Sequence, residues 1–127
     1  MARKNVDIDL VREIALAFEG VEESTTYGAP SFKVRGQLMA CPAINKSAEP
    51  NSLGVFIGFD QREELLAADP TVYYVTDHYV DHPVVLVRLS EIRRDALQGL
   101  LQLAWRFASA KGKASVRARR KWRLPAR

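Results

Sequence analysis

The densest group of side chains able to do chemistry lies at residues 77–82, where the sequence reads Asp-His-Tyr-Val-Asp-His. Imidazoles and carboxylates are ligand types that zinc and iron accept. His78 and His82 are four residues apart, but they lie in a turn between two β-branched runs, so the geometry of two ligands on one helix does not apply. Asp77 and Asp81 also favour turns through local hydrogen bonds. We therefore expect a structural loop that holds no metal or cofactor, or one in which His78 and Tyr79 contact a ligand or partner.

A second candidate is the segment Tyr27-Gly28-Ala29-Pro30. Gly28 and Pro30 predict a backbone that turns tightly. Tyr27 next to them could stack on a base or another ring at a groove, or it could close the core against the first helix. Both interpretations of Tyr27 stay open at this point.

Nucleophilic catalysis finds little support in the sequence. Neither Ser24 nor Ser31 lies in a Gly-x-Ser-x-Gly turn. Cys41 sits among apolar neighbours, where a thiol is usually an inert packing group. We expect no catalytic residues and a protein that is not an enzyme.

The basic residues form a more coherent set. Residues 106–127 hold nine basic residues and no acidic one, whereas the preceding 105 residues hold ten basic and fifteen acidic residues, a net charge of −5. Such a basic end is typical of polyanion binding or of a solvated terminus. For Lys33 and Arg35, the alternative to phosphate binding is an ordinary solvated strand face. The candidate phosphate contacts are Lys33, Arg35, Lys46, Arg117, Arg119, Arg120, Lys121 and Arg123.

The periodicity of apolar residues predicts the helices that would position these candidates. Steps of three and four residues predict a helix from Asp7 to Glu19 and a last helix that is capped by Ser90 and runs to about Ala110. A capping-box pattern at residues 60–63, with Asp60 as the cap, predicts a short helix between them.

Alternating and β-branched runs predict five strands, at residues 31–35, 38–44, 53–59, 72–76 and 84–88. We expect a loop at 22–30 and a turn at Gly36-Gln37. The expected inward-facing residues are Phe32, Val34, Leu53, Val55, Ile57, Phe59, Val85 and Val87, while Gly54 and Gly58 leave the other face of the third strand thin. The order α-β-β-β-α-β-β-α predicts an α+β fold of two layers, with a mostly antiparallel five-stranded sheet and helices on one face.

The composition is that of one ordinary domain, with 127 residues of which 47% are hydrophobic and 27% are charged. We expect one domain at residues 1–110 and a basic tail at 111–127. No apolar run approaches the roughly 20 residues of a membrane span, and the start lacks the apolar segment of a signal peptide. A single cysteine excludes an intrachain disulfide framework. We therefore expect a cytoplasmic protein without membrane partners.

Three stretches resemble the MmcQ/YjbR family. They are residues 20–36, which include Tyr-Gly-Ala-Pro-Ser-Phe-Lys-Val-Arg-Gly, then 59–66, Phe-Asp-Gln-Arg-Glu-Glu-Leu-Leu, and 69–79, Asp-Pro-Thr-Val-Tyr-Tyr-Val-Thr-Asp-His-Tyr, followed by Pro83 and residues 87–89. The resemblance spans roughly residues 7–108 and implies an α+β fold similar to the secretion-chaperone-like class. Family members carry a DNA-binding label because two hairpins were likened to a double wing, which is a structural analogy.

These observations lead to two functional hypotheses. The first is a non-enzymatic protein that binds DNA, or RNA, mainly through the phosphate backbone. The second is a domain that binds a small ligand or a protein in a groove near Tyr27, His78 and Tyr79. A continuous positive face would favour the first, and scattered lysines beside an aromatic pocket would favour the second.

Overall fold

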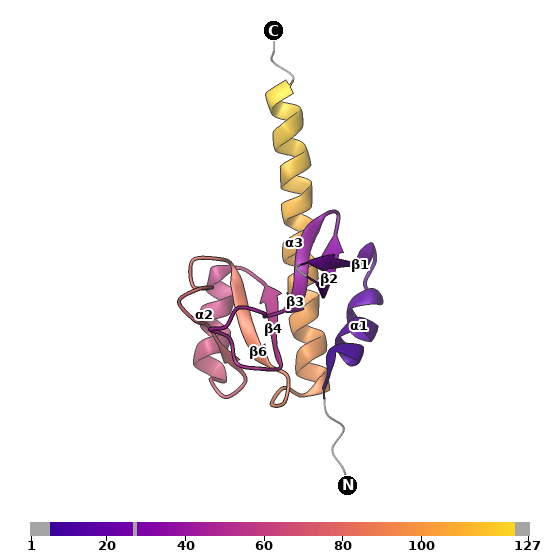
Figure 1. Ribbon diagram of the computed structural model, residues 1–127. Coiled ribbons are helices and arrows are strands. Elements are labelled where there is room, and N and C mark those ends of the chain that lie inside the picture. Colours follow the sequence, from indigo (N-terminus) through magenta and orange to yellow (C-terminus); the bar gives the residue numbers. More distant parts are fainter. Residues whose placement is uncertain (1–5, 27, 124–127) are drawn as a thin grey trace.

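The computed structural model describes residues 6–26 and 28–123, and it describes the side chains within this range up to Lys111. The element order is α1 (Ile8–Leu16), β1 (Val21–Thr26), β2 (Ala29–Val34), β3 (Gln37–Pro42), β4 (Ser52–Phe56), α2 (Phe59–Ala68), β5 (Tyr73–Tyr74), β6 (Val84–Arg88) and α3 (Arg94–Arg123). The expected α+β class is confirmed, and Figure 1 shows the long α3 beside the strands.

The sheet has six antiparallel strands in the order β1-β2-β3-β4-β6-β5, not five as expected. The missing strand is β1, which lies in the segment expected to be a loop. Its sequence, Val-Glu-Glu-Ser-Thr-Thr, has no apolar alternation because the strand is at the edge of the sheet and largely exposed. Pairing with β2 over all six residues defines it instead.

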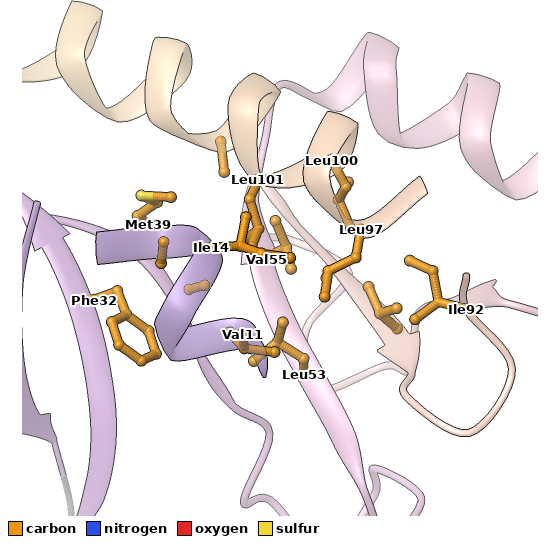
Figure 2. Close-up of a cluster of buried hydrophobic side chains, with 14 of the residues drawn as sticks. Val11, Ile14, Phe32, Met39, Leu53, Val55, Ile92, Leu97, Leu100 and Leu101 are labelled. Atoms are coloured by element: carbon orange, nitrogen blue, oxygen red, sulfur yellow. The ribbon is translucent and has the colours of Figure 1, made fainter. Parts of the chain in front are cut away.

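The core lies on one face of this sheet. Phe32 and Val34 of β2 and Leu53 and Val55 of β4 are buried there, as the alternation predicts. Figure 2 shows Val11 and Ile14 of α1 and Leu97, Leu100 and Leu101 of α3 against this layer. Leu65 and Leu66 of α2 pack against the same cluster. The core therefore forms between the sheet and the helices.

The start of α2 corrects two expectations. The helix begins at Phe59 with Gly58 as its N-cap and no side-chain cap, so Asp60 is not the cap. Phe59 belongs to the helix and is 46% exposed, although the strand pattern placed it in the core. The register turns Arg62 inward, where its guanidinium donates to the carbonyl oxygens of His82 and Val84. These two bonds tie α2 to the start of β6.

Two further boundaries differ from the sequence expectations. The β2–β3 turn is Arg35-Gly36, with φ of 53° and 78°, and not Gly36-Gln37. A two-residue hairpin turn of this kind needs positive φ at both positions, so Arg35 belongs to the turn and β2 ends at Val34. Ser90 does not cap α3, which begins at Arg94 after a turn that buries Ile92.

Helix α3 continues through Ala110, where the tail was expected to start, and ends at Arg123. Figure 1 shows this last part of α3 projecting beyond the sheet. At about 1.5 Å per residue, the twelve residues after Lys111 add about 18 Å of helix. Within the described ranges, no helix combines the length and the apolar character that a membrane crossing needs.

Candidate functional site

A pocket of about 700 Å³ lies on the sheet face opposite the core. Its floor includes Cys41, Gly54, Phe56 and Val84, which alternate with core-facing residues of β3, β4 and β6. Gly54 keeps this floor low, because a Cβ there would stand 3.4 Å from the carbonyl oxygen of Cys41 and 3.5 Å from Val84. Among the described residues, those that line the pocket are Thr26, Leu38, Cys41, Pro42, Ala43, Ile44, Asn45, Lys46, Gly54, Phe56, His78, Tyr79 and Val84.

Two loops form the walls of the pocket. We call them the 43–51 loop, between β3 and β4, and the 75–83 loop, between β5 and β6. The Tyr79 hydroxyl accepts a hydrogen bond of 3.3 Å from the backbone N–H of Asn45. A second bond joins the hydroxyls of Ser47 and Thr76, which are 2.8 Å apart. The walls are thus tied to each other as well as to the sheet.

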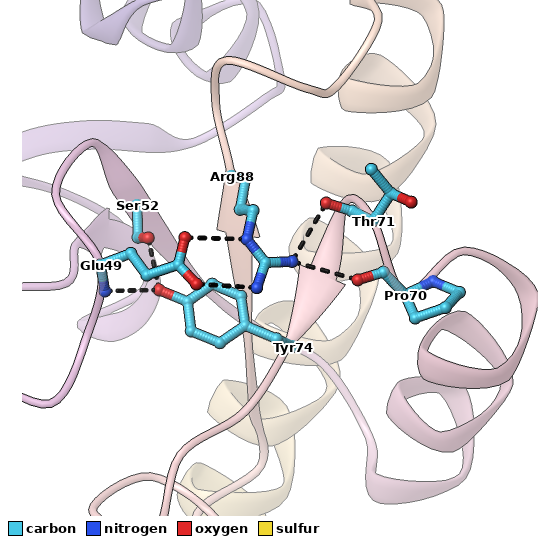
Figure 3. A network of polar contacts seen from close by, with 6 residues as sticks. All are labelled: Glu49, Ser52, Pro70, Thr71, Tyr74 and Arg88. Atoms are coloured by element: carbon cyan, nitrogen blue, oxygen red, sulfur yellow. Dashed lines mark hydrogen bonds and ion pairs between the residues drawn. The ribbon is translucent and has the colours of Figure 1, made fainter.

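The 43–51 loop is also fixed to the sheet through Glu49, as Figure 3 shows. The Glu49 carboxylate accepts two bonds from the Arg88 guanidinium, at 2.9 and 2.8 Å. Arg88 donates further bonds to the carbonyl oxygens of Pro70 and Thr71 and lies 4.3 Å from the centre of the Tyr74 ring. The bonded guanidinium holds the pKa of Glu49 below its ordinary value.

Tyr74 completes this network. Its hydroxyl accepts a bond of 2.8 Å from the backbone N–H of Glu49 and also bonds to the Ser52 hydroxyl. On the other side, the buried Arg62 holds the end of the 75–83 loop through the carbonyl oxygen of His82, at 2.9 Å. Both walls therefore have fixed anchors, so the pocket exists without a ligand.

The structure brings three of the predicted site residues together: Lys46, His78 and Tyr79 all line the pocket. His78 meets Tyr79 edge to face, with ring centres 4.8 Å apart. His78 and Lys46 are exposed, whereas Tyr79 is half-buried. Apart from Thr26 of β1, the polar side chains of the described lining belong to the two loops, above an apolar floor.

Two other predicted residues, Lys33 and Arg35, lie outside the pocket lining. Lys33 is half-buried on β2, opposite Glu22 of β1 and next to Leu38 of β3, and does not line the pocket. Arg35 is exposed in the hairpin turn. Tyr27 lies outside the described residues.

The predicted tail contacts belong to the end of α3. Their backbone is helical, and their side chains lie outside the described part of the structure. These residues are Arg117, Arg119, Arg120, Lys121 and Arg123.

Sequence reasoning missed the apolar part of the site. Ile44, Phe56 and Cys41 line the pocket, although Cys41 was expected to be only a packing group. Burial raises the pKa of the Cys41 thiol, which agrees with a slowly reacting thiol at neutral pH. The one sequence signal of this pocket was Gly54, which leaves the strand face opposite the core without a side chain at that position.

The 77–82 segment does not assemble metal ligands within the described part of the chain. There, no three side chains of His, Cys, Asp or Glu converge in a way that could hold an ion. The expectation of a protein without a resident metal stays a prediction, which metal analysis of the purified protein can test.

Comparison with known proteins places the chain in a family. The family model described as YjbR matches residues 16–107, which include the sheet, α2 and the pocket. The chain belongs to the YjbR family. This agrees with the resemblance carried by residues 20–36, 59–66 and 69–79.

The family relatives do not supply a function. An uncharacterized protein of Mycobacterium tuberculosis, Rv2570, and one of Mycobacterium bovis, Mb2600, are each 43% identical to this chain over 74 residues. That match covers 54% of this chain and 57% of each relative, so the chain spans little more than half their length.

A solved structure shares the fold. The crystal structure of Deinococcus radiodurans protein DR2400, with a domain described as DUF419, superposes with a TM-score of 0.64 at 20% identity. The superposition covers 83% of this chain and 80% of that one. At this level of identity, the likeness concerns the fold alone.

Proposed function

We propose that this YjbR protein is a non-enzymatic binding protein whose pocket takes a small, largely apolar molecule. The observation that carries the proposal is the preformed pocket of about 700 Å³, with an apolar floor and polar groups on two anchored loops. Ligand sites typically have volumes of about 300–1,000 Å³, mostly apolar walls and a few converging polar groups.

The positions of the basic side chains also favour this function over binding along a nucleic-acid backbone. Lys46 stands at the pocket, beside His78 and Tyr79. Lys33 faces Glu22 across the β1–β2 pair, which reduces the positive potential of that strand surface. The described residues therefore include a lysine in the lining of a pocket with aromatic side chains, which is the pattern expected of a ligand site.

Binding of Nile red, an uncharged dye that fluoresces in apolar surroundings, tests the proposal. We expect saturable binding of one dye per chain, lost after Cys41 is alkylated with N-ethylmaleimide, which would occupy the floor. The variant Cys41→Ala, treated in the same way, should keep the dye site and serves as the control. No saturable binding, or equal binding after the block, would contradict the proposal.

Binding to nucleic acid is a second candidate, favoured by a different observation. From Arg106 to its end at Arg123, α3 carries eight basic residues and no acidic one, and Figure 1 shows that end clear of the sheet. A helix of this charge can contact DNA or RNA phosphates without reading sequence. The dependence of DNA affinity on salt tests this candidate, and we give the expected slopes below.

A further inference from the structure

From the charges around the pocket, we infer that its ligand is an amphipathic anion: an apolar chain or ring with one carboxylate or similar head group. The inference rests on the proposed function, since it concerns the ligand of that same pocket. Its basis is the separation of apolar and polar groups in the lining and the single sign of charge that the lining carries.

The apolar end of the ligand has a defined place. Gly54 and Val84 are buried, and Phe56 and Cys41 are half-buried beside them at the floor. Thr26, the nearest hydroxyl on β1, already bonds to the buried Ser31 hydroxyl at 3.0 Å. An apolar group placed on this floor displaces water without leaving a polar atom unpaired, which favours binding.

The charged end of the ligand has its place at the loops. Among the described residues of the lining, Lys46 carries the only formal charge, and none of them is acidic. Within the described ranges, neither Lys46 nor His78 takes part in an ion pair. A lysine and an imidazole at one rim can both donate to the same anionic head group.

The neighbouring carboxylates do not fill this role. Glu49 lies in the same loop as Lys46, but both of its oxygens accept bonds from Arg88. Asp77 and Asp81 are exposed in the 75–83 loop, and neither lines the pocket. Within the described part of the lining, Lys46 thus has no acidic partner, and a cationic head group placed there would be repelled.

Three probes with the same chain and different head groups test the inference on the full-length protein: decanoate and decylammonium, each below its micelle concentration, and decanol below its solubility limit. Binding is measured by calorimetry and by protection of Cys41 from alkylation. We expect decanoate to bind about fivefold more tightly than decanol, which is the upper range for an exposed ion pair. Decylammonium should bind more weakly than decanol.

Charge variants then assign the preference to one residue. Lys46→Met should remove the fivefold advantage of decanoate over decanol. Lys46→Glu should reverse the order, so that decylammonium binds more tightly than decanoate. Lys33→Met is the matched control, because Lys33 lies on β2 outside the lining, and it should leave the order unchanged.

The outcomes separate the inference from the function on which it rests. Equal affinity for decanoate and decanol, unchanged in Lys46→Met, would overturn the anionic head group and leave an apolar pocket. Failure of all three probes, both in calorimetry and in protection of Cys41, would overturn the pocket as a ligand site and the inference with it. Loss of decanoate preference in Lys33→Met would place the anion elsewhere and also overturn the inference.

Discussion

The hydroxyl of Tyr79 accepts a hydrogen bond from the backbone N–H of Asn45, which lies 34 residues earlier in the chain. This bond joins the two loops that wall the pocket, and the strand order makes it reachable. The 43–51 loop enters β4 at Ser52 and the 75–83 loop enters β6 at Val84, which lies beside the other end of β4, so the loops meet because both fold over the same sheet face. The shape of the pocket depends on the bonds that hold these loops.

Removing the Tyr79 hydroxyl should loosen the pocket. In Tyr79→Phe the N–H of Asn45 loses its partner, so we expect a loss of about 1 kcal/mol in the free energy of unfolding and severalfold weaker binding of Nile red. Tyr73→Phe is the control, because the Tyr73 hydroxyl forms no hydrogen bond among the described residues. Denaturant unfolding and dye titration measure both effects. Equal dye affinity in wild type and Tyr79→Phe would contradict this role for the bond.

The ion pair of Glu49 with Arg88 should make the stability of the protein depend on pH. The pKa of the Glu49 carboxyl in the folded protein lies below the ordinary 4.5, so the ion pair stabilises the fold above that pH. This stabilisation is lost as the pH falls through the lowered pKa of Glu49. Glu49→Gln should therefore be less stable than wild type at pH 7 and equally stable in strong acid. Thermal unfolding at a series of pH values measures the difference.

Glu23→Gln provides a matched comparison for that experiment. Glu23 has its pKa lowered in the same way by Arg12, but the pair joins β1 to α1 on the core side of the sheet. Its stability should follow the same pH pattern, while only Glu49→Gln weakens binding of Nile red. Equal dye binding in the two variants would show that Glu49 does not hold the pocket wall.

The Cys41 thiol should report on the pocket through its reactivity. Burial raises its pKa above the ordinary 9.0, so at pH 8 we expect alkylation by iodoacetamide to be slower than that of glutathione. The rate should still increase between about pH 9 and pH 10. Mass spectrometry follows the reaction without ambiguity, since the chain has one cysteine. A rate equal to that of glutathione at pH 8 would show an open, solvated thiol.

The basic end of α3 makes a separate prediction about DNA. If about five of its charges contact phosphates, the logarithm of affinity for duplex DNA should fall against the logarithm of salt concentration with a slope of about −4 to −5. Replacing Arg117, Arg119 and Arg120 by Gln should reduce the slope by about 2 to 3 and weaken binding to all sequences alike. An unchanged slope would exclude this part of the helix as the contact.

The core layer could be predicted from the sequence, because burial follows a local alternation. Phe32 and Val34 were expected inward with Lys33 outward, and the structure buries both apolar residues. The edge strand β1 could not be predicted, since nothing in Val21–Thr26 alternates and its pairing with β2 defines it. Arg35 was misplaced for a similar reason, because the turn and not the strand sets its backbone.

The candidate site was predictable only in part. His78 and Tyr79 stood out as a dense polar cluster, and Lys46 as a basic residue in a loop, but nothing local joined them. Their meeting depends on β4 pairing with β6, a contact between strands that are not consecutive in the sequence. The burial of Arg62 could not be predicted for the same reason. Its guanidinium bonds to the carbonyl oxygens of His82 and Val84, which lie about twenty residues away in the sequence.

Nuclear magnetic resonance of the full-length, nitrogen-15-labelled protein during titration with decanoate tests the central claim most directly. We predict that the largest amide shifts fall on pocket residues such as Asn45, Gly54 and Tyr79, and that they saturate together with one affinity. The amides of α1, on the other face of the sheet, should not move. Shifts that cluster on the basic end of α3, or that never saturate at the pocket residues, would contradict the claim.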